Sequence, residues 1–447
     1  MPPEIQERYR ELAKARGLWI GGSSAATQDL SDLFVVRAVE QYLQPEGRFS
    51  FVMPFSVLSR KQFKGFRTGD WTSKGTGLFS VTFGEPHDYS RVKPPLFPVP
   101  SVVISGTPTA GISGAMPTDS VRWTGRLGNH NVPWEDAEPS LRQAAAATVL
   151  ATDAPGSPYR ARFLQGATIV PRVLMTVNEV EAGPLGVPHG RRSVRSERSP
   201  LEKAPWKNLP SLEAVVEEQF LFPLHLGATI VAYRERAPKL CVIPWLEGRL
   251  VDGQSDELDQ YPGLAAWWRQ AEQLWNLNSA GRMSLLQRID FQRLLFKQFP
   301  LAEHRVAYSA SGQHLAAARI SDPSALIEHK LYWARCSSLE EARYLAGVLN
   351  STALADAVRP LQSQGQHNPR DFDLNVFAWP FPAYDAASDL HARIVELSTQ
   401  AEDVATSLEL DPARSFQVAR RVTREALVET GIGGEIDALV PDLVGGG

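Results

Sequence analysis

The chain has 447 residues, of which 43% are hydrophobic and 21% charged, and its formal net charge is −4. This composition excludes a wholly disordered protein, and without a global basic field any nucleic-acid surface must be local. No apolar run approaches the ~20 residues that span a bilayer, and the opening MPPEIQERYR is too polar for a signal peptide, so we expect a cytoplasmic protein without a membrane segment. The two cysteines, Cys241 and Cys336, are predicted to be reduced, buried thiols.

The first quarter of the chain predicts a helix, a turn and a strand in succession. From Leu30 to Leu43 apolar residues recur at helical spacing, and Pro45 and Gly47 end the pattern. The run RFSFVMP that follows is typical of a central strand buried on both faces. GLFSVTF and FPVPSVVISG predict two further short strands. Together these elements predict an αβ step of a parallel sheet.

The stretch from about 105 to 158 is rich in Gly, Pro, Ser and Thr and predicts a junction between domains. Beyond it, GATIVPRVLMTVNEVEAG and LHLGATIVAYRERAPKLCVIPWL alternate as strands do. The segment between them, GPLGVPHGRRSVRSERSPLEKAPWK, predicts a flexible loop. Its basic residues are Arg191, Arg192, Arg195, Arg198, Lys203 and Lys207.

Helical patterns return in the last part of the chain. SLEEARYLAGVLN opens with a capping box, in which Ser338 precedes Glu341 by three residues. A heptad seam predicts a later helix that packs against this chain or another. The seam consists of Leu390, Ile394, Leu397, Ala401, Val404 and Leu408.

The sequence contains no phosphate-binding or metal-binding motif that would indicate a particular catalytic chemistry. It has no glycine-rich phosphate loop, no HExxH and no Cys/His metal spacing. Glu340 and Glu341 begin a helix, where the macrodipole already explains them. Composition and spacing alone therefore predict an α/β part joined to a mixed domain with one basic loop.

The segment DLSDLFVVRAVEQYLQPEGRFSFVMPFSVLSRKQF resembles the post-catalytic segment of N6-adenine DNA methyltransferases of restriction–modification and phage-defence systems. In that family the catalytic Asn/Asp-Pro-Pro-aromatic tetrapeptide is followed by a helix of this kind and a strand ending in V-x-P. RVKPPLFPVPSVVI is similar to a later segment whose aromatic residue stacks on the flipped adenine, a role the resemblance gives to Phe97. The matching residues are Gln28, Asp29, Leu30, Phe34, Gly47 and Pro54, with Glu46 at a common glycine position.

Later segments resemble the target-recognition region of the same enzymes, so the similarity covers roughly residues 6 to 408. They include FLQGATIVPRVL, RSERSPLEKAPWKNL and LQSQGQHNPRDFDLNVFAWPFPAYD. The resemblance implies an α/β fold: a partial Rossmann-like methyltransferase sheet, an α+β target-recognition domain and a C-terminal helical segment. The expected boundaries are 1–110 for the methyltransferase part, 111–158 for the junction, 159–384 for target recognition and 385–447 for the helices.

Two elements of the family are absent from this sequence. One is the Phe-x-Gly-x-Gly strand–turn that binds S-adenosyl-L-methionine, the cofactor that the resemblance implies. The other is the catalytic tetrapeptide, since KPPL at Lys93 has the prolines without the Asn/Asp or the aromatic residue. Both precede the first segment in the family's order. We therefore expect the chain to be inactive by itself.

The leading interpretation is the C-terminal half of an adenine-N6 DNA methyltransferase, with double-stranded DNA and a complementary methylase half as partners. The basic loop would neutralise phosphates and a second loop would read base edges. Alternatives are a non-enzymatic specificity or interaction subunit, and an inactive gene fragment. The basic loop could equally be a solvated surface loop, the second loop an ordinary turn, and Phe97 a packed aromatic. The candidates in the second loop are Gln364, Gln366, His367, Asn368 and Arg370.

Overall fold

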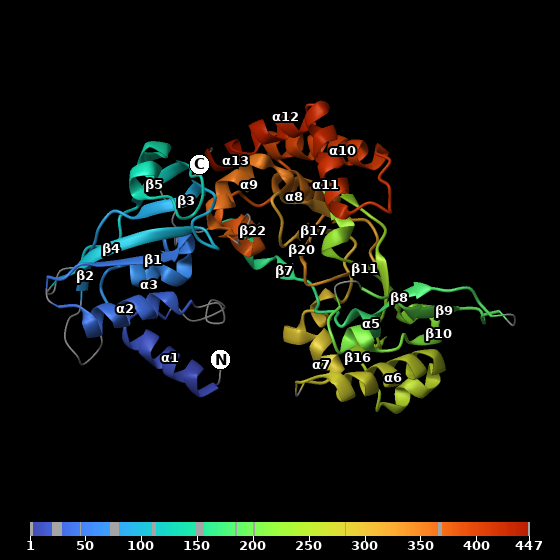
Figure 1. Ribbon diagram of the computed structural model, residues 1–447. Helices are drawn as coiled ribbons and strands as arrows, with labels where there is room; N and C mark the ends of the chain where they lie inside the picture. The colour runs from blue at the N-terminus through green and yellow to red at the C-terminus, as the bar shows by residue number, and fades with distance from the viewer. Residues whose placement is uncertain are drawn as a thin grey trace. The chain divides into compact units, whose positions relative to one another are not determined.

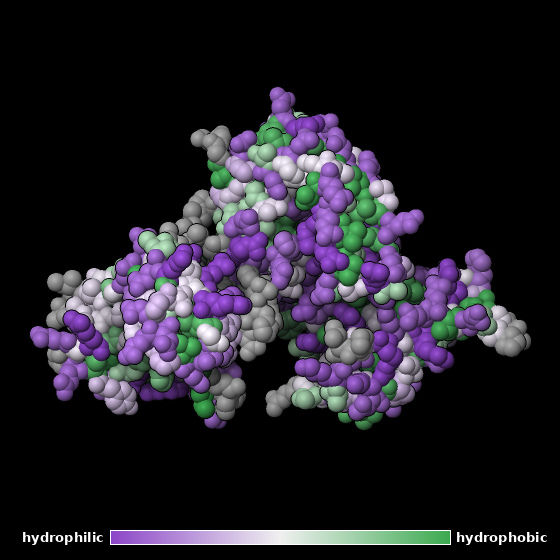
Figure 2. All heavy atoms as spheres, turned by 45° about the horizontal axis from the view of Figure 1, so that its top comes forward, coloured by the Kyte–Doolittle hydropathy of each residue, from purple (hydrophilic) through white to green (hydrophobic). Residues whose placement is uncertain are grey.

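The computed structural model describes residues 3–19, 29–44, 46–71, 80–109, 113–147, 156–183, 186–199, 202–281, 283–364 and 369–445. The chain forms two compact units, one of residues 1–155 and 358–378 and the other of residues 156–357 and 379–447. Each unit combines helices with sheets (Figure 1), which confirms a mixed α/β protein. Hydrophilic residues cover much of the face in Figure 2, with hydrophobic patches between them. In the described ranges no helix combines the length and apolar character needed to cross a membrane.

The first unit is built on one sheet with the strand order β1-β4-β3-β5-β6, in which β2 also pairs with β4. β4 runs antiparallel to β1, β2 and β3, whereas β3 and β5 are parallel. The elements are α1 (Pro3–Ala15), α2 (Ser31–Tyr42), β1 (Phe49–Pro54), α3 (Lys64–Arg67), β2 (Ser80–Phe83), β3 (His87–Lys93), β4 (Ser101–Thr109), β5 (Asp119–Arg126), α4 (Trp134–Ala137), β6 (Leu141–Ala147) and the small hairpin β21 (Ser363–Gln364) with β22 (Pro369–Asp371).

Strand β1 is the run RFSFVMP, and its place in the sheet differs from the prediction. Within the described part of the chain it pairs only with β4, so it is an edge strand. Phe49 and Met53 are buried, whereas Ser50 and Val52 are exposed. The prediction of a central parallel strand buried on both faces was therefore wrong. Helices α1 and α2 lie on one face of this sheet (Figure 1), and apolar residues of both helices share a core with Phe49.

The expected junction at 111–158 contains regular structure. Residues 119–126 and 141–147 form β5 and β6, which pair antiparallel along their length. Trp123 on β5 stacks on Tyr89 of β3, with ring centroids 5.6 Å apart. Residues 358–378 also group with the first unit. The boundaries therefore differ from the expected ones, because Gly and Pro at the turns obscured the short alternating strands between them.

The second unit holds a sheet of order β10-β9-β8-β14-β11-β19 and another of order β18-β17-β20-β7. Helix α6 packs against β10 and buries Trp267 and Trp268 in a hydrophobic core of this unit. Its strands are β7 (Leu164–Gln165), β8 (Thr176–Glu179), β9 (Arg191–Ser196), β10 (Glu213–Glu217), β11 (Leu221–His225), β12 (Ile230–Val231), β13 (Arg234–Glu235), β14 (Lys239–Val242), β15 (Trp245–Leu246), β16 (Arg249–Leu250), β17 (Arg305–Ser309), β18 (Ala317–Ile320), β19 (Leu326–Ile327) and β20 (Leu331–Arg335).

The helices predicted near the C-terminus are present. Ser338 caps α8 by accepting a hydrogen bond from the Glu341 N–H at 3.2 Å. The predicted heptad helix is α10, which buries Ile394, Leu397 and Ala401 and packs against α8 of the same chain. The helices of the unit are α5 (Arg172–Met175), α6 (Pro262–Asn278), α7 (Leu285–Ile289), α8 (Leu339–Asn350), α9 (Thr352–Val358), α10 (Asp389–Ser407), α11 (Phe416–Glu429), α12 (Ile432–Leu439) and α13 (Asp442–Gly445).

Both cysteines are free thiols. Cys241 is fully buried and Cys336 is half-buried. Burial raises the pKa of the Cys336 thiol to about 12. A thiol with a raised pKa carries little thiolate at neutral pH and is a poor nucleophile.

Candidate nucleic-acid interface

Three of the predicted basic residues lie on a strand. Arg191, Arg192 and Arg195 belong to β9, which pairs antiparallel with β8 on one side and β10 on the other. Alternation along this strand places Arg191 and Arg195 on the face opposite the buried Val194 and Ser196. Arg192 shares the face of Val194 and Ser196 but is exposed near the start of the strand. The prediction of a flexible loop was therefore wrong for these residues. The flanking Gly, Pro and Arg residues suggested a loop, and the strand exists only because two neighbours pair with it.

Each of these arginines already has a carboxylate partner. The glutamates come from the neighbouring strands and from the turn after β10, which places opposite charges across the sheet. The neighbouring carboxylates of Glu179 and Glu218 raise the pKa of Arg192. Phosphates would meet a largely neutralised surface here. The ion pairs are Arg191–Glu217 at 3.1 Å, Arg192–Glu179 at 3.3 Å, Arg192–Glu218 at 2.9 Å and Arg195–Glu213 at 2.7 Å.

The other three basic residues follow β9 and differ from one another. Arg198 donates hydrogen bonds to the carbonyl oxygens of Lys207 at 2.5 Å and Leu209 at 2.8 Å, so its guanidinium holds this turn together. Lys207 is exposed. Lys203 is also exposed, and it lines a cavity.

The remaining predicted residues belong to the first unit. Phe97 is half-buried in the loop between β3 and β4. Gln364 lies on β21 and Arg370 on β22. Gln366, His367 and Asn368 lie outside the described residues. The predicted site residues are therefore divided between the two units, and their roles in binding DNA stay predictions.

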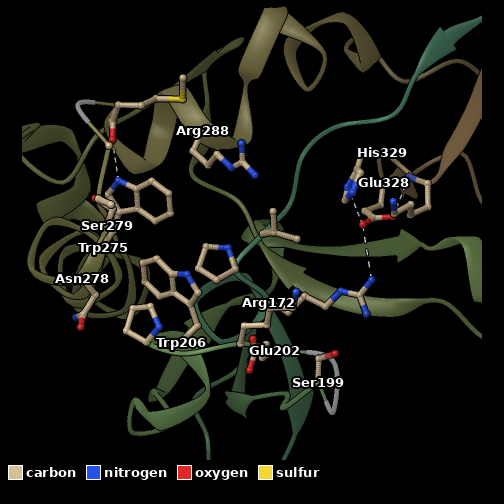
Figure 3. A pocket seen from close by; sticks show the side chains of 18 residues that line it. Arg172, Ser199, Glu202, Trp206, Trp275, Asn278, Ser279, Arg288, Glu328 and His329 are labelled. Atoms are coloured by element: carbon tan, nitrogen blue, oxygen red, sulfur yellow. Dashed lines mark hydrogen bonds and ion pairs between the residues drawn. The ribbon is translucent and has the colours of Figure 1, made fainter. Parts of the chain in front are cut away.

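The cavity beside Lys203 has a volume of about 650 Å³ (Figure 3). Its size is that of pockets that bind small molecules. Two stacked indoles form one wall: the ring centroids of Trp206 and Trp275 are 5.2 Å apart and their planes differ by 12°. Trp275 lies near the end of α6 and donates its Nε1–H to the carbonyl oxygen of Met283 at 2.8 Å. Trp206 lies on the short 3₁₀ turn Trp206–Asn208 and is half-buried.

The opposite wall contains a buried carboxylate. Glu328 follows β19 and is completely buried. Its Oε1 lies 2.8 Å from His329 Nδ1 and 3.6 Å from Arg172 Nη2, and its Oε2 accepts the Lys330 N–H at 3.1 Å (Figure 3). Burial alone would raise the pKa of Glu328, but hydrogen bonding from His329 and the Lys330 amide, with the charge of Arg172, lowers it. Glu328 is therefore a buried carboxylate beside the Nδ1 atom of the His329 ring.

The cavity carries an excess of positive charge. Arg172, Lys203, Arg288 and Lys330 line it, against the carboxylates of Glu202 and Glu328. Among the residues that the structure describes, Lys203, Arg288 and Lys330 form no ion pair, in contrast to the arginines of β9. Unpaired cations beside an aromatic wall suit an anionic ligand.

Sequence reasoning identified Lys203 and missed the rest of the cavity. Trp206 stands three residues after Lys203 and could have been noticed as an aromatic residue within a basic segment. Trp275, Arg288 and His329 come from distant segments that only the fold brings together. Across the described ranges, no group of three His, Cys, Asp or Glu side chains is placed to hold a metal ion.

The whole chain is similar in fold to the Type IIL restriction–modification enzyme MmeI, whose structure was determined in complex with DNA. The TM-score is 0.53 at 13% sequence identity, and the match covers 100% of this chain and 52% of MmeI. The Type IIG restriction endonuclease BpuSI matches with a TM-score of 0.29 at 12% identity, over 99% of this chain and 52% of BpuSI, which is too low to establish a common fold. No family model matches the chain, and no curated protein matches its sequence. The chain spans about half the length of both enzymes.

Proposed function

We propose that this chain is the target-recognition half of a site-specific adenine-N6 DNA methyltransferase of a restriction–modification or phage-defence system, acting in the cytoplasm on double-stranded DNA. The observation that carries this proposal is the fold similarity to MmeI, which extends over the whole chain and half of the enzyme. The post-catalytic sequence DLSDLFVVRAVEQYLQPEGRFSFVMP supports the methyltransferase assignment.

The proposed partner is a polypeptide with the missing catalytic elements, and the outer edge of β1 offers it a place to dock. The Phe55 N–H donates to the Pro100 carbonyl at 2.8 Å, which continues the β1–β4 pairing. Because pairing alternates along an antiparallel ladder, the N–H groups of Ser50 and Val52 point away from β4, toward the free edge. No other described strand pairs with this edge, and an edge of this kind is a template for another strand.

Exposed apolar side chains accompany this edge. Phe34 on α2 is 67% exposed and contacts Phe51 of β1 edge-to-face, with ring centroids 6.4 Å apart. Val52 is 50% exposed. A strand added beside β1 would extend the ladder and cover these side chains at once. In this proposal the partner supplies the glycine-rich strand–turn for S-adenosyl-L-methionine, the methyl donor, and this chain supplies the DNA-binding surface.

An assay of methyl transfer from tritiated S-adenosyl-L-methionine to DNA tests whether this chain needs the partner polypeptide for catalysis. The chain alone is expected to transfer no methyl group, because it lacks the residues that bind the donor and align the base. Addition of a polypeptide carrying the glycine-rich strand–turn and the tetrapeptide is expected to produce transfer. Transfer by the chain alone would contradict the proposal. DNA binding without restored transfer would instead favour a non-enzymatic specificity subunit.

The unpaired cations of the cavity are expected to contribute more to duplex binding than the arginines of β9. The double variant Lys203→Ala/Arg288→Ala should weaken binding about tenfold near 0.1 M salt and lower the slope of log K against log salt by about 1.8, since each phosphate contact contributes roughly 0.9. The matched variant Arg191→Ala/Arg192→Ala removes the same charge, but it should leave the slope unchanged. A lower slope in the second variant would instead assign the phosphate contacts to β9.

A further inference from the structure

We propose that the cavity between Trp206 and the Glu328–His329 pair binds one nucleotide, with its base against Trp206 and its phosphate among Arg288, Lys203 and Lys330. This site goes beyond the binding of duplex backbone, since a cavity of about 650 Å³ has the size of a small-molecule pocket and combines an aromatic wall with cations. Where the nucleotide belongs to a DNA strand, the inference rests on the proposed function. A free nucleotide presents the same chemistry.

The aromatic wall offers a stacking surface for the base of the nucleotide. Trp206 lines the cavity, and its stacking on Trp275 fixes the plane of its indole. The hydrogen bond from Trp275 Nε1 to Met283 anchors the pair to the chain after α6. A rigid, half-buried indole is a stacking surface for any base, because every base has a π face.

The cations of the cavity would bind the phosphate of the nucleotide. Figure 3 shows the Arg288 guanidinium between the tryptophan wall and the Glu328–His329 wall. Arg172 is 3.6 Å from Glu328, so Arg288, with Lys203 and Lys330, is left to meet an anion. An arginine fork matches two phosphate oxygens, and lysines add charge without fixed geometry.

The buried Glu328 carboxylate lies against the half-buried ring of His329 at one wall of the cavity. Glu328 Oε1 lies 2.8 Å from His329 Nδ1, so the other ring nitrogen, Nε2, is the one that remains for a ligand. His329 is therefore a positioning group for the phosphate or the sugar. The wall is rigid, since the Lys330 amide and Arg172 also bind the same carboxylate.

Calorimetric titration of the full chain with AMP, dTMP, adenosine and inorganic phosphate tests the site. Both nucleotides are expected to bind, while adenosine and phosphate, each lacking half of the contacts, should bind at least about tenfold more weakly.

Trp206→Ala should weaken AMP binding about tenfold and Trp206→Phe should restore it. Trp134→Ala, at an exposed tryptophan of the other unit, is the control for tryptophan loss. Lys203→Ala should weaken AMP binding, whereas Lys207→Ala, in the same segment but outside the cavity, should not.

A competition experiment separates the two sources of the nucleotide. A duplex with one bulged base should displace AMP more strongly than a fully paired duplex if the site receives a nucleotide of DNA. Equal competition by the two duplexes, with AMP binding intact, assigns the site to a free nucleotide. The inference is overturned if neither nucleotide binds, or if folded Trp206→Ala binds AMP as the unaltered chain does. Ordinary duplex binding in such a case would leave the proposed function standing.

Discussion

Replacing Val52 by proline is expected to weaken the assembly of this chain with the catalytic half and to lower the restored methyl transfer. The N–H group that proline removes points to the free edge of β1, so the hydrogen bonds between β1 and β4 are kept. A strand added at this edge would lose one ladder hydrogen bond and meet the proline ring. We expect at least about a tenfold loss of affinity between the halves.

Val52→Ala is the matched control for this experiment, because it shortens the same exposed side chain and keeps the N–H group. It should leave most of the restored transfer. Thermal unfolding of the first unit should be similar in both variants, since Val52 is 50% exposed. If the proline variant supports the same transfer as the unaltered chain, the partner does not dock on the edge of β1.

The second large effect is expected for Glu341→Ala, which should lower the free energy of unfolding of the second unit by about 1–3 kcal/mol. The Glu341 side chain is 4% exposed. Its Oε1 accepts hydrogen bonds from Tyr159 Oη at 2.9 Å and Arg162 Nη1 at 2.5 Å, and its Oε2 accepts the Ser337 N–H at 2.6 Å. Tyr159 in turn accepts the Tyr384 N–H at 2.9 Å. Loss of the carboxylate therefore removes the acceptor of the buried Tyr159 hydroxyl, of Arg162 and of the Ser337 N–H.

Glu340→Ala is the control for charge and helix position. Glu340 stands beside Glu341 in the first turn of α8 but is exposed, so its loss should change the free energy of unfolding by about 0.5 kcal/mol or less. Urea unfolding followed by circular dichroism measures both variants. A similar small effect in both would show that the Tyr159–Arg162–Glu341 network does not stabilise the unit.

The lowered pKa of Glu341 predicts that the free energy of unfolding depends on pH. Burial alone would raise the pKa of Glu341, but hydrogen bonds from Arg162, Ser337 and Tyr159 lower it from 4.5 to about 2. The stability from this group is complete above pH 4.5 and is lost as the pH falls toward 2, a change of about 3 kcal/mol. The free energy of unfolding of Glu341→Gln should therefore fall less steeply than that of the unaltered chain across this interval. Parallel curves would contradict the lowered pKa.

The local pattern of the sequence was enough to predict several helices. The apolar spacing from Leu30 to Leu43 corresponds to α2, and the heptad seam to α10. Ser338 caps α8 as its distance from Glu341 predicts. These features were predictable because helical hydrogen bonds and caps join residues three or four positions apart.

The sequence by itself determined the positions of α2, α8 and α10 and which family its first segments resemble. Only the tertiary structure decided that β1 is an antiparallel edge strand, that glutamates neutralise the arginines of β9, and that Trp206, Arg288 and His329 line one cavity. Strand pairing, ion pairing across a sheet and the walls of a cavity depend on contacts between residues far apart in the chain. Such contacts follow from the packing of the whole unit and leave no period in the sequence.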